Sequence, residues 1–180
     1  DMLVNGSPEI EKKVREFYEI PDGTKIAIYA PTFRAHKKLD CYNLDFDKVP
    51  DYLEERDGCP WVMLIRLHPR LAKQTKNIVP DSPRYINAAQ YTDMQELSVA
   101  SDLMISDYSS VITDFMLTRK PGFMYVPDLD KYLKSRGMYF EMEELPFPYA
   151  RTNEEFLQKL KSFDEAAYKE KVDAFVKKIG

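Results

Sequence analysis

Two adjacent serines in the stretch ISDYSSVITDF, residues 105–115, point most directly to chemistry in this chain. Apolar runs lie before and after the stretch, which indicates a turn from a strand into a helix. Ser109 and Ser110 would then lie at the helix N-terminus, where unpaired backbone N–H groups and the helix dipole favour an anion. A serine there more often serves only as an N-cap. The doubled serine, the preceding Asp107 and the basic residues after neighbouring strands favour a phosphate-binding site.

His68 is a second candidate, because it follows an apolar run in the segment RLHPR. A lone histidine is more often structural than catalytic. Pro69, however, forces an extended backbone and would direct the imidazole toward the end of the strand. Arg66 lies two residues earlier and by strand alternation shares the face of His68. The alternative role for Arg66 is a structural ion pair.

The segment PTFR supplies two further candidates, Thr32 and Arg34, which could bind phosphate or acceptor oxygens. His36 lies in the basic stretch RAHKK and is interpreted as part of a solvated patch. Asp128 and Asp130 in VPDLDKY are weaker candidates and are interpreted as loop caps. No set of carboxylates has the spacing of metal ligands, so we predict neither a metal nor a cofactor.

Strands and helices alternate along the chain, and this order must position these residues. Nearly continuous apolar runs predict five strands, at residues 25–30, 61–69, 84–88, 102–106 and 121–127. Capping residues and periodic apolar positions predict helices at 8–18, 49–58, 92–101, 109–119, 152–163 and 165–179. The alternation predicts the α/β fold class, with a doubly wound parallel sheet covered on both faces.

Ligands of such sheets bind beyond the carboxyl ends of the strands. The segments that follow the five predicted strands are PTFR, LHPR, NAAQYTD, SDYSS and VPDLDKY. They are rich in hydroxyl groups, hydrogen-bond donors and cations. The sequence therefore predicts a site for a phosphate-bearing ligand at this edge of the sheet.

Four of these blocks, YAPTFR, RLHP, ISDYSSVITDF and PGFMYVPDLDKY, resemble those of the CDP-glycerol glycerophosphotransferases in order and spacing. These enzymes are the teichoic-acid primases and polymerases of bacterial cell-wall synthesis. The resemblance covers nearly the whole chain. It implies one Rossmann-like half of a glycosyltransferase type B (GT-B) fold, with residues 1–7 ending an interdomain linker and residues 8–180 forming the C-terminal, donor-nucleotide-binding domain.

The resemblance also implies roles for single residues. The histidine of the RLHP block acts on the donor pyrophosphate in this family, so His68 is the expected catalytic residue. Ser109, Ser110, Thr32, Arg34 and Arg66 are the expected pyrophosphate ligands, and Asp114 resembles the carboxylate that binds the ribose diol in type B glycosyltransferases. Asp114 lies one helical turn after Ser110, on the same side of the helix. A solvent-exposed helix aspartate is the alternative interpretation.

The implied reaction moves glycerol phosphate from CDP-glycerol to a wall or capsule polymer acceptor and releases CMP. A second histidine, in a WHG segment of the absent N-terminal domain, would act as the base. The fragment alone is expected to bind nucleotide and to turn over little or nothing. The polymer or lipid-linked acceptor would be reached through the missing domain, at the inner face of the cell membrane.

Composition restricts the range of functions. The net charge of −4 and pI near 5.3 give no electrostatic reason to expect a nucleic-acid partner. The two cysteines, Cys41 and Cys59, match no metal spacing and favour a reducing, cytoplasmic compartment. No apolar run approaches a membrane span. The chain starts without methionine, which suggests a piece of a longer protein.

Three alternatives stay open. The donor could carry ribitol phosphate instead of glycerol phosphate, or a sugar transferred by an enzyme of the same architecture. A different class of protein, a nucleotide-binding module without chemistry, would keep the same strands and loops. The sequence upstream of Asp1 would separate the enzyme from the binding module, because only the enzyme needs the WHG segment.

Overall fold

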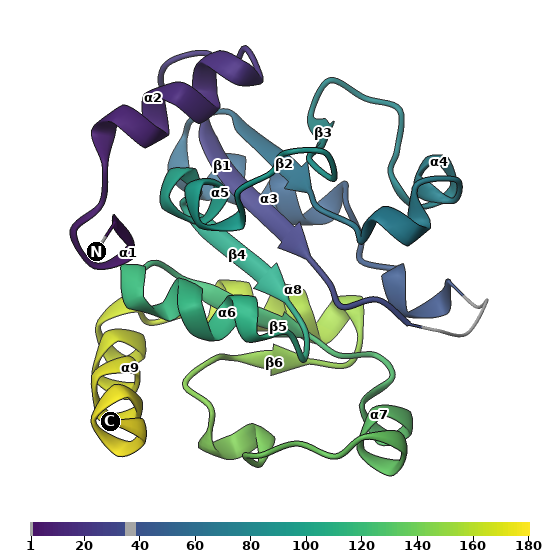
Figure 1. Ribbon diagram of the computed structural model, residues 1–180, viewed down its shortest axis with the longest axis vertical. Helices are drawn as coiled ribbons and strands as arrows, with labels where there is room; N and C mark the ends of the chain where they lie inside the picture. The colour runs from purple at the N-terminus through teal and green to yellow at the C-terminus, as the bar shows by residue number, and fades with distance from the viewer. Residues whose placement is uncertain (1, 35–38) are drawn as a thin grey trace.

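Six parallel strands form one sheet in the order β3-β2-β1-β4-β5-β6. The structure is a computed structural model that describes residues 2–34 and 39–180 (Figure 1). The strands are β1 (Lys25–Ala30), β2 (Trp61–Ile65), β3 (Tyr85–Asn87), β4 (Leu103–Ser106), β5 (Gly122–Tyr125) and β6 (Tyr149–Ala150). The chain begins in the middle of the sheet, runs to one edge, and returns through β4 to the opposite edge. This reversal of direction places a topological switch point between β1 and β4.

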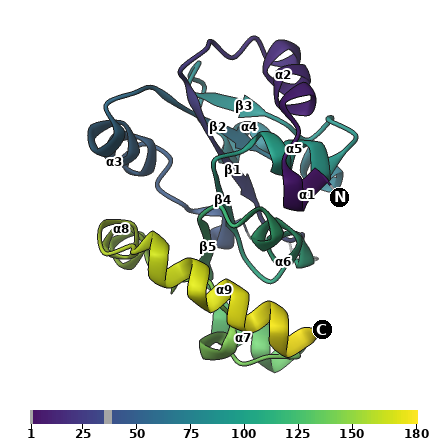
Figure 2. The same cartoon turned by 90° about the vertical axis from the view of Figure 1, so that its left-hand side faces the viewer.

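Helices cover both faces of the sheet, as Figure 2 shows with the sheet seen edge-on. On one face lie α2 (Pro8–Phe17), α5 (Met94–Ala100), α6 (Ser110–Phe115) and α9 (Glu165–Ile179). On the opposite face lie α3 (Lys48–Asp57), α4 (Thr75–Ile78) and α8 (Asn153–Lys161). The remaining helices are α1 (Met2–Asn5), α7 (Leu129–Ser135) and the 3-10 turns η1 (Asp40–Tyr42), η2 (Pro69–Leu71), η3 (Met116–Thr118) and η4 (Met142–Glu144).

Alternate residues of each strand enter two different hydrophobic cores. Ile26 and Ile28 of β1 pack among α2, α5, α6 and α9, whereas Ala27 and Tyr29 pack among α3 and α8. Because successive strand side chains point to opposite faces, a strand buried on both faces must be apolar at nearly every position. Five of the six β1 residues are buried accordingly. The predicted doubly wound α/β class follows directly from this packing.

Several element boundaries differ from the sequence-based prediction. The second strand ends at Ile65, short of the predicted residue 69, although Leu67 beyond it is buried in the same core as α3 and α8. Both β6 and α7 were missed. The segment 1–7, predicted as the end of a linker, contains α1, whose Leu3 is buried. Its assignment as a linker stays a prediction.

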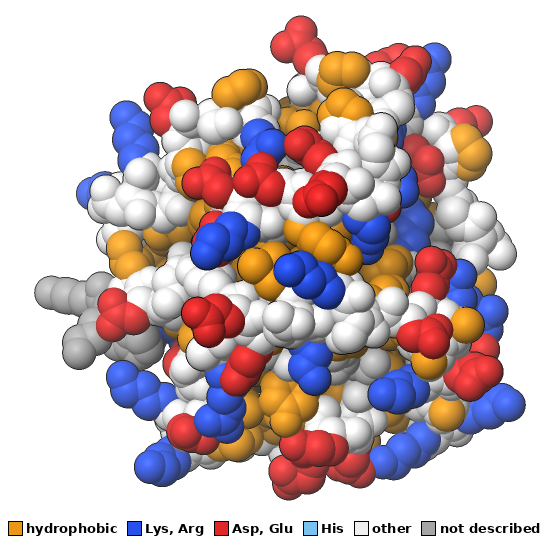
Figure 3. Space-filling model, turned by 180° about the vertical axis from the view of Figure 1, so that it is seen from behind, with side chains coloured by type: hydrophobic (Ala, Val, Ile, Leu, Met, Phe, Trp, Pro, Cys, Tyr) orange, Lys and Arg blue, Asp and Glu red, His pale blue; other side chains and the backbone are white. Residues whose placement is uncertain are grey.

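Acidic and basic side chains are interspersed over the back of the molecule, as Figure 3 shows. The mixture of signs leaves no broad basic surface on this face, in keeping with the slightly negative net charge. The longest described helix, α9, has 15 residues, and no helix within residues 2–34 and 39–180 has the length and hydrophobicity of a membrane span.

Candidate functional site

A cavity of about 280 Å³ opens at the carboxyl ends of β1 and β2, next to the start of α6. We call it the switch-point cavity, because it lies where the strand order reverses direction between β1 and β4. Four of the predicted site residues line it together: Thr32, Arg66, His68 and Ser109. They come from three segments of the chain that meet only because the strands are parallel and adjacent. Doubly wound folds commonly bind their ligands at this position.

His68 is held in one orientation by its neighbours. Its backbone is extended, as predicted from Pro69, and its Nδ1 accepts a hydrogen bond of 3.2 Å from the backbone N–H of Arg70. Its ring centre lies 5.0 Å from that of Phe33. Since Nδ1 accepts, the neutral imidazole carries its proton on Nε2. The side chain therefore offers a hydrogen-bond donor, which suits an anionic ligand.

Arg66 lies deeper in the same cavity. Its Nη1 donates hydrogen bonds to the backbone carbonyls of Ala88, at 2.8 Å, and Ala89, at 3.0 Å. No ion pair of Arg66 is found within the described residues, so the alternative of a structural ion pair does not apply there. Burial lowers the pKa of Arg66, although it remains cationic. Its Nε and Nη2 make no hydrogen bond to described residues, so a cation with free donors faces the cavity.

Arg34 does not line the switch-point cavity but is buried beside it. All five of its N–H groups are used. Nε donates to Asp128 at 2.8 Å, Nη2 donates to Asp107 at 3.0 Å and to Asp128 at 3.3 Å, and Nη1 donates to the carbonyl oxygen and hydroxyl of Thr32. The guanidinium therefore has no donor left for a phosphate. We call Arg34, Asp107, Asp128 and Thr32 the Arg34 cluster.

The carboxylates of the Arg34 cluster join three strand ends. Asp107 accepts hydrogen bonds from the backbone N–H and the hydroxyl of Thr32, at 2.9 Å and 2.6 Å. Burial raises the pKa of Asp107, and the charge of Arg34 together with these bonds opposes the rise. Burial also acts to raise the pKa of Asp128, but the hydrogen bonds from Arg34 and Tyr108 and the charge of Arg34 together outweigh it, so this pKa lies below its usual range. The cluster thus ties the loops after β1, β4 and β5 together.

Two tyrosines extend the Arg34 cluster toward α7. The rings of Tyr108 and Tyr132 are stacked, with their centres 3.6 Å apart, and the Arg34 guanidinium lies 5.0 Å from the ring of Tyr108. The Tyr108 hydroxyl donates to Asp128 at 3.0 Å. Neither tyrosine was predicted as a site residue. The sequence offers no signal for the pair, because a strand-end loop and a later helix bring them together.

The two serines have different surroundings. Ser109 is the N-cap of α6, and its hydroxyl accepts a hydrogen bond of 3.3 Å from the backbone N–H of Val111. Ser110 is exposed and makes no side-chain hydrogen bond to the described residues. Asp114 is exposed on α6 and lines neither the switch-point cavity nor a second, larger cavity that is lined by Ser110. The predicted set is therefore divided between a cavity, a buried cluster and an exposed helix surface.

The weaker candidates have structural partners. Asp128 belongs to the Arg34 cluster, and Asp130 pairs with Arg151 at 3.1 Å. His36 lies outside the described residues. Among residues 2–34 and 39–180, no group of three or more His, Cys, Asp or Glu side chains is placed to hold a metal ion.

The strand order, the doubly wound packing and the cavity at the switch point define a Rossmann-like α/β domain. The chain belongs to the CDP-glycerol:poly(glycerophosphate) glycerophosphotransferase family, whose model matches residues 1–179. The family resemblance expected from the four sequence blocks is thereby confirmed.

Relatives and solved structures agree with this assignment. A teichoic acid poly(glycerol phosphate) polymerase of Bacillus subtilis is 32% identical over 174 residues, 94% of this chain and 23% of the polymerase. A teichoic acid ribitol-phosphate primase of Bacillus spizizenii is 32% identical over 155 residues, 84% of this chain and 38% of the primase. The chain therefore spans well under half the length of these relatives.

The wall teichoic acid polymerase TagF, in a histidine variant soaked with CDPG, superposes with a TM-score of 0.75 at 31% identity. The match covers 97% of this chain and 42% of that one. It confirms the predicted fold class, a Rossmann-like half of the GT-B fold.

Proposed function

We propose that this chain is the donor-nucleotide-binding domain of a transferase that moves glycerol phosphate from CDP-glycerol to a wall or capsule polymer. The observation that carries the proposal is the switch-point cavity, where Arg66 and His68 present hydrogen-bond donors to one space. A diphosphate is an anion with many acceptor oxygens, and charge-assisted hydrogen bonds to such oxygens are strong. The family membership and the CDPG-soaked TagF structure support the choice of donor.

In the proposed reaction, an acceptor hydroxyl oxygen forms a bond to the β-phosphorus of CDP-glycerol. The bond from that phosphorus to the oxygen bridging the two phosphates breaks, and CMP leaves with the bridging oxygen. The hydroxyl proton passes to a base, which we assign to a histidine of an N-terminal domain. Within this chain, the Nε2–H of His68 and the guanidinium of Arg66 would stabilise charge that builds on the leaving phosphate.

We assign residues 8–180 to this domain and residues 1–7 to the end of the linker that precedes it. Alone, the domain would bind nucleotide and turn over little or nothing, because the base belongs to the N-terminal domain. The full-length enzyme would work in the cytoplasm, on the inner face of the membrane where a lipid-linked acceptor is reached. Thr32 and Arg34 contribute to the site by supporting its walls, since their donors are already used.

Ribitol phosphate is a second candidate for the transferred group. The similarity to a ribitol-phosphate primase is as high as that to the glycerol phosphate polymerase. A sugar donor would also suit this fold, and so would a nucleotide-binding module without chemistry. All of these functions share the nucleotide, so the first test addresses nucleotide binding and the second addresses the polyol.

The first prediction is that cytidine nucleotides stabilise this chain. A ligand bound only by the native state raises the melting temperature, by an amount that grows with the logarithm of ligand concentration over Kd. We expect CDP-glycerol and CMP to raise Tm and to give measurable titration heats, with smaller effects from UDP and GDP. A parallel titration with CDP-ribitol compares the two polyols. The ribose role of Asp114 is tested by comparing CMP with 2′-deoxy-CMP in the wild type and in Asp114→Ala, which should weaken binding of CMP more than of 2′-deoxy-CMP. Equal or absent responses to all the nucleotides would remove the nucleotide assignment.

A further inference from the structure

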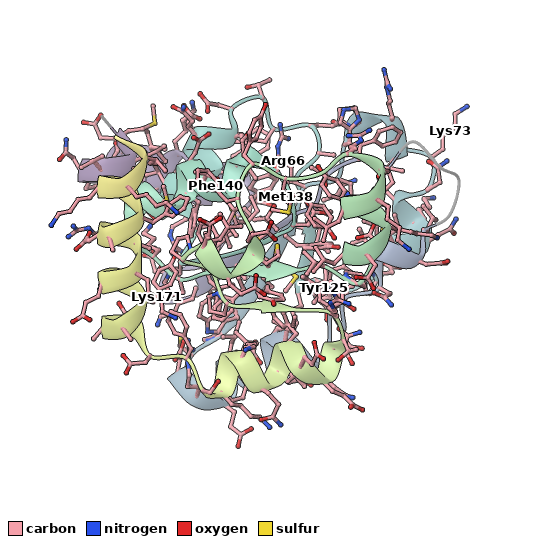
Figure 4. The ribbon with its side chains drawn as sticks, turned by 90° about the horizontal axis from the view of Figure 1, so that it is seen from below. Arg66, Lys73, Tyr125, Met138, Phe140 and Lys171 are labelled. Carbon is pink, nitrogen blue, oxygen red and sulfur yellow. The ribbon has the colours of Figure 1, made fainter. Side chains whose placement is uncertain are left out.

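A second cavity, of about 480 Å³, shares Ser109 with the switch-point cavity. We call it the aromatic cavity. Its walls come from α6, β5, α7 and the segment between α7 and β6, and its lining includes Ser110, Thr113, Tyr132, Arg136, Met138 and Phe140. Figure 4 shows Met138 and Phe140 between α9 and α7. Its volume lies in the range of about 300–1,000 Å³ that is usual for ligand cavities.

The inner part of the aromatic cavity is apolar and fixed. Ile112, Met124 and Phe147 line it and are each 3% exposed or less, as members of the core beneath α6 and α9. The stacked pair of Tyr108 and Tyr132 forms one wall. Such a lining provides contact surface for the carbon skeleton of a ligand but no charge.

The rim of the aromatic cavity is polar and has unused donors. Arg136 is exposed, and its guanidinium makes no ion pair or side-chain hydrogen bond within the described residues. The hydroxyls of Ser110 and Thr113 likewise make none there. Tyr139 is fully exposed at the same rim. A free cation and two free hydroxyls around an apolar floor fit a small anion that carries both hydroxyls and a carbon chain.

We propose that the aromatic cavity binds the terminal glycerol phosphate unit of the acceptor polymer. This inference rests on the proposed function, and it names a second subsite that the donor does not occupy. Arg136 would bind the acceptor phosphodiester, Ser110 and Thr113 would bind glycerol oxygens, and the carbon chain would lie against the tyrosines.

The position of the aromatic cavity relative to the switch-point cavity supports the acceptor as its occupant. In phosphoryl transfer the attacking and leaving oxygens lie roughly in line through the phosphorus. With the leaving CMP in the switch-point cavity, the nucleophile approaches from the opposite side. Ser109 lines both cavities, so a phosphorus beside Ser109 would be within reach of an acceptor hydroxyl in the aromatic cavity while CMP occupies the switch-point cavity.

The test uses methionine methyl NMR of this chain, because each cavity contains its own reporter. Met138 lines the aromatic cavity and Met94 lines the switch-point cavity, while Met63 lies in the opposite core and serves as the control. A short poly(glycerol phosphate) oligomer should shift the Met138 methyl and leave Met94 and Met63 unchanged. CMP should shift Met94 and leave Met138 unchanged.

The matched variants are Arg136→Ala and Lys134→Ala, which remove one exposed cation each from the same region of the chain. Lys134 lies on α7 but does not line the cavity. Because a charge-assisted hydrogen bond to phosphate is lost, Arg136→Ala should weaken oligomer binding by about tenfold or more. Lys134→Ala should change it less than about twofold, and CMP affinity should be the same in both variants.

The outcomes separate this inference from the proposed function. No shift of Met138 by the oligomer, or equal losses in Arg136→Ala and Lys134→Ala, would overturn the acceptor subsite while CMP binding still upheld the donor site. A shift of Met138 by CDP-glycerol but not by CMP would assign the cavity to the donor glycerol and also overturn it. If CMP shifted neither methyl, the donor assignment itself would fail.

Discussion

At the scale of single residues, Arg34 shows how all the hydrogen-bond donors of a cation beside the switch-point cavity can be used by the protein itself. Its five N–H groups all bind the chain, and its side chain is 7% exposed. We expect Arg34→Met to lower the free energy of unfolding by about 3–5 kcal/mol, because Asp107 is left buried without its cation. Urea unfolding measures the loss.

Two further variants make the Arg34 experiment specific. Arg34→Lys should recover only part of the stability, since an ammonium has three donors where the guanidinium has five. Arg136→Met, at an exposed position just after α7, should cost less than about 0.5 kcal/mol. An Arg34→Met protein as stable as the Arg136→Met protein would show that the cluster contributes nothing to the fold.

His68 gives the opposite case, an exposed residue with a free donor. We expect His68→Ala in the full-length enzyme to lower kcat on the order of a hundredfold, with a smaller change in KM, because the imidazole acts on charge that develops during the reaction. The measurement is steady-state CMP release. Tm should stay close to that of the wild type, since the side chain is exposed. A normal kcat in His68→Ala would show that His68 has only a structural role.

At the scale of elements, the two serines at the start of α6 have different roles: Ser109 caps the helix, and Ser110 is free to bind a ligand. Ser109 caps the helix, so Ser109→Ala should lower stability by about 1 kcal/mol with or without nucleotide. Ser110 makes no side-chain hydrogen bond to the described residues and lines the aromatic cavity, so Ser110→Ala should leave Tm unchanged and weaken binding of the poly(glycerol phosphate) oligomer. Thermal scans and titration calorimetry on both variants and the double variant measure this. Loss of stability in both variants, with the affinity for the oligomer intact, contradicts a ligand-binding role of Ser110.

The strand β5 is packed closely at its first residue. A Cβ at Gly122 would lie 3.1 Å from Tyr168 Oη and 3.2 Å from Phe147 Cδ1. Gly122→Ala should therefore cost about 1–3 kcal/mol in the free energy of unfolding, as overpacked cores do. Tyr168→Phe removes the nearer atom, so chemical denaturation should show Gly122→Ala costing less in that background. An equal cost in both backgrounds would exclude Tyr168 as the source.

The sequence predicted five of the six strands and the layer arrangement, because strands buried on both faces are apolar throughout. It missed β6, whose two residues, Tyr149 and Ala150, are too few to show any periodicity. It also missed α7, a helix that buries little more than Leu129. Local sequence patterns predict elements in which many residues are buried. Strand β6 and helix α7 each bury only one residue, so they leave little pattern in the sequence.

For the candidate site, the sequence predicted four residues that share one cavity, but it did not predict the partners of the others. Thr32, Arg66, His68 and Ser109 do line one cavity. The role of Arg34 could not be predicted, because its carboxylates lie 73 and 94 residues away in the chain. A free arginine and a fully paired one look alike in sequence, and only tertiary contacts distinguish them.

At the scale of the whole molecule, the overall charge does not favour the anionic donor that we propose. The net charge is −4, and the face seen in Figure 3 mixes both signs. Long-range attraction would therefore contribute little to nucleotide binding. Under the proposed function, affinity would come from short contacts within the cavities, with Arg66 in the switch-point cavity and Arg136 in the aromatic cavity.

The lengths of the strands across the sheet also have a consequence for how copies of the domain behave when crowded together. Strand β1, in the middle, has six residues, whereas the two edge strands, β3 and β6, have three and two. An edge strand attracts other chains through the row of unpaired backbone groups that it presents. Because the two edge strands are so short, a second copy of the domain finds few unpaired backbone groups with which to extend the hydrogen bonding of the sheet. The taper of the sheet therefore protects the domain against fibre-like self-assembly during synthesis and storage.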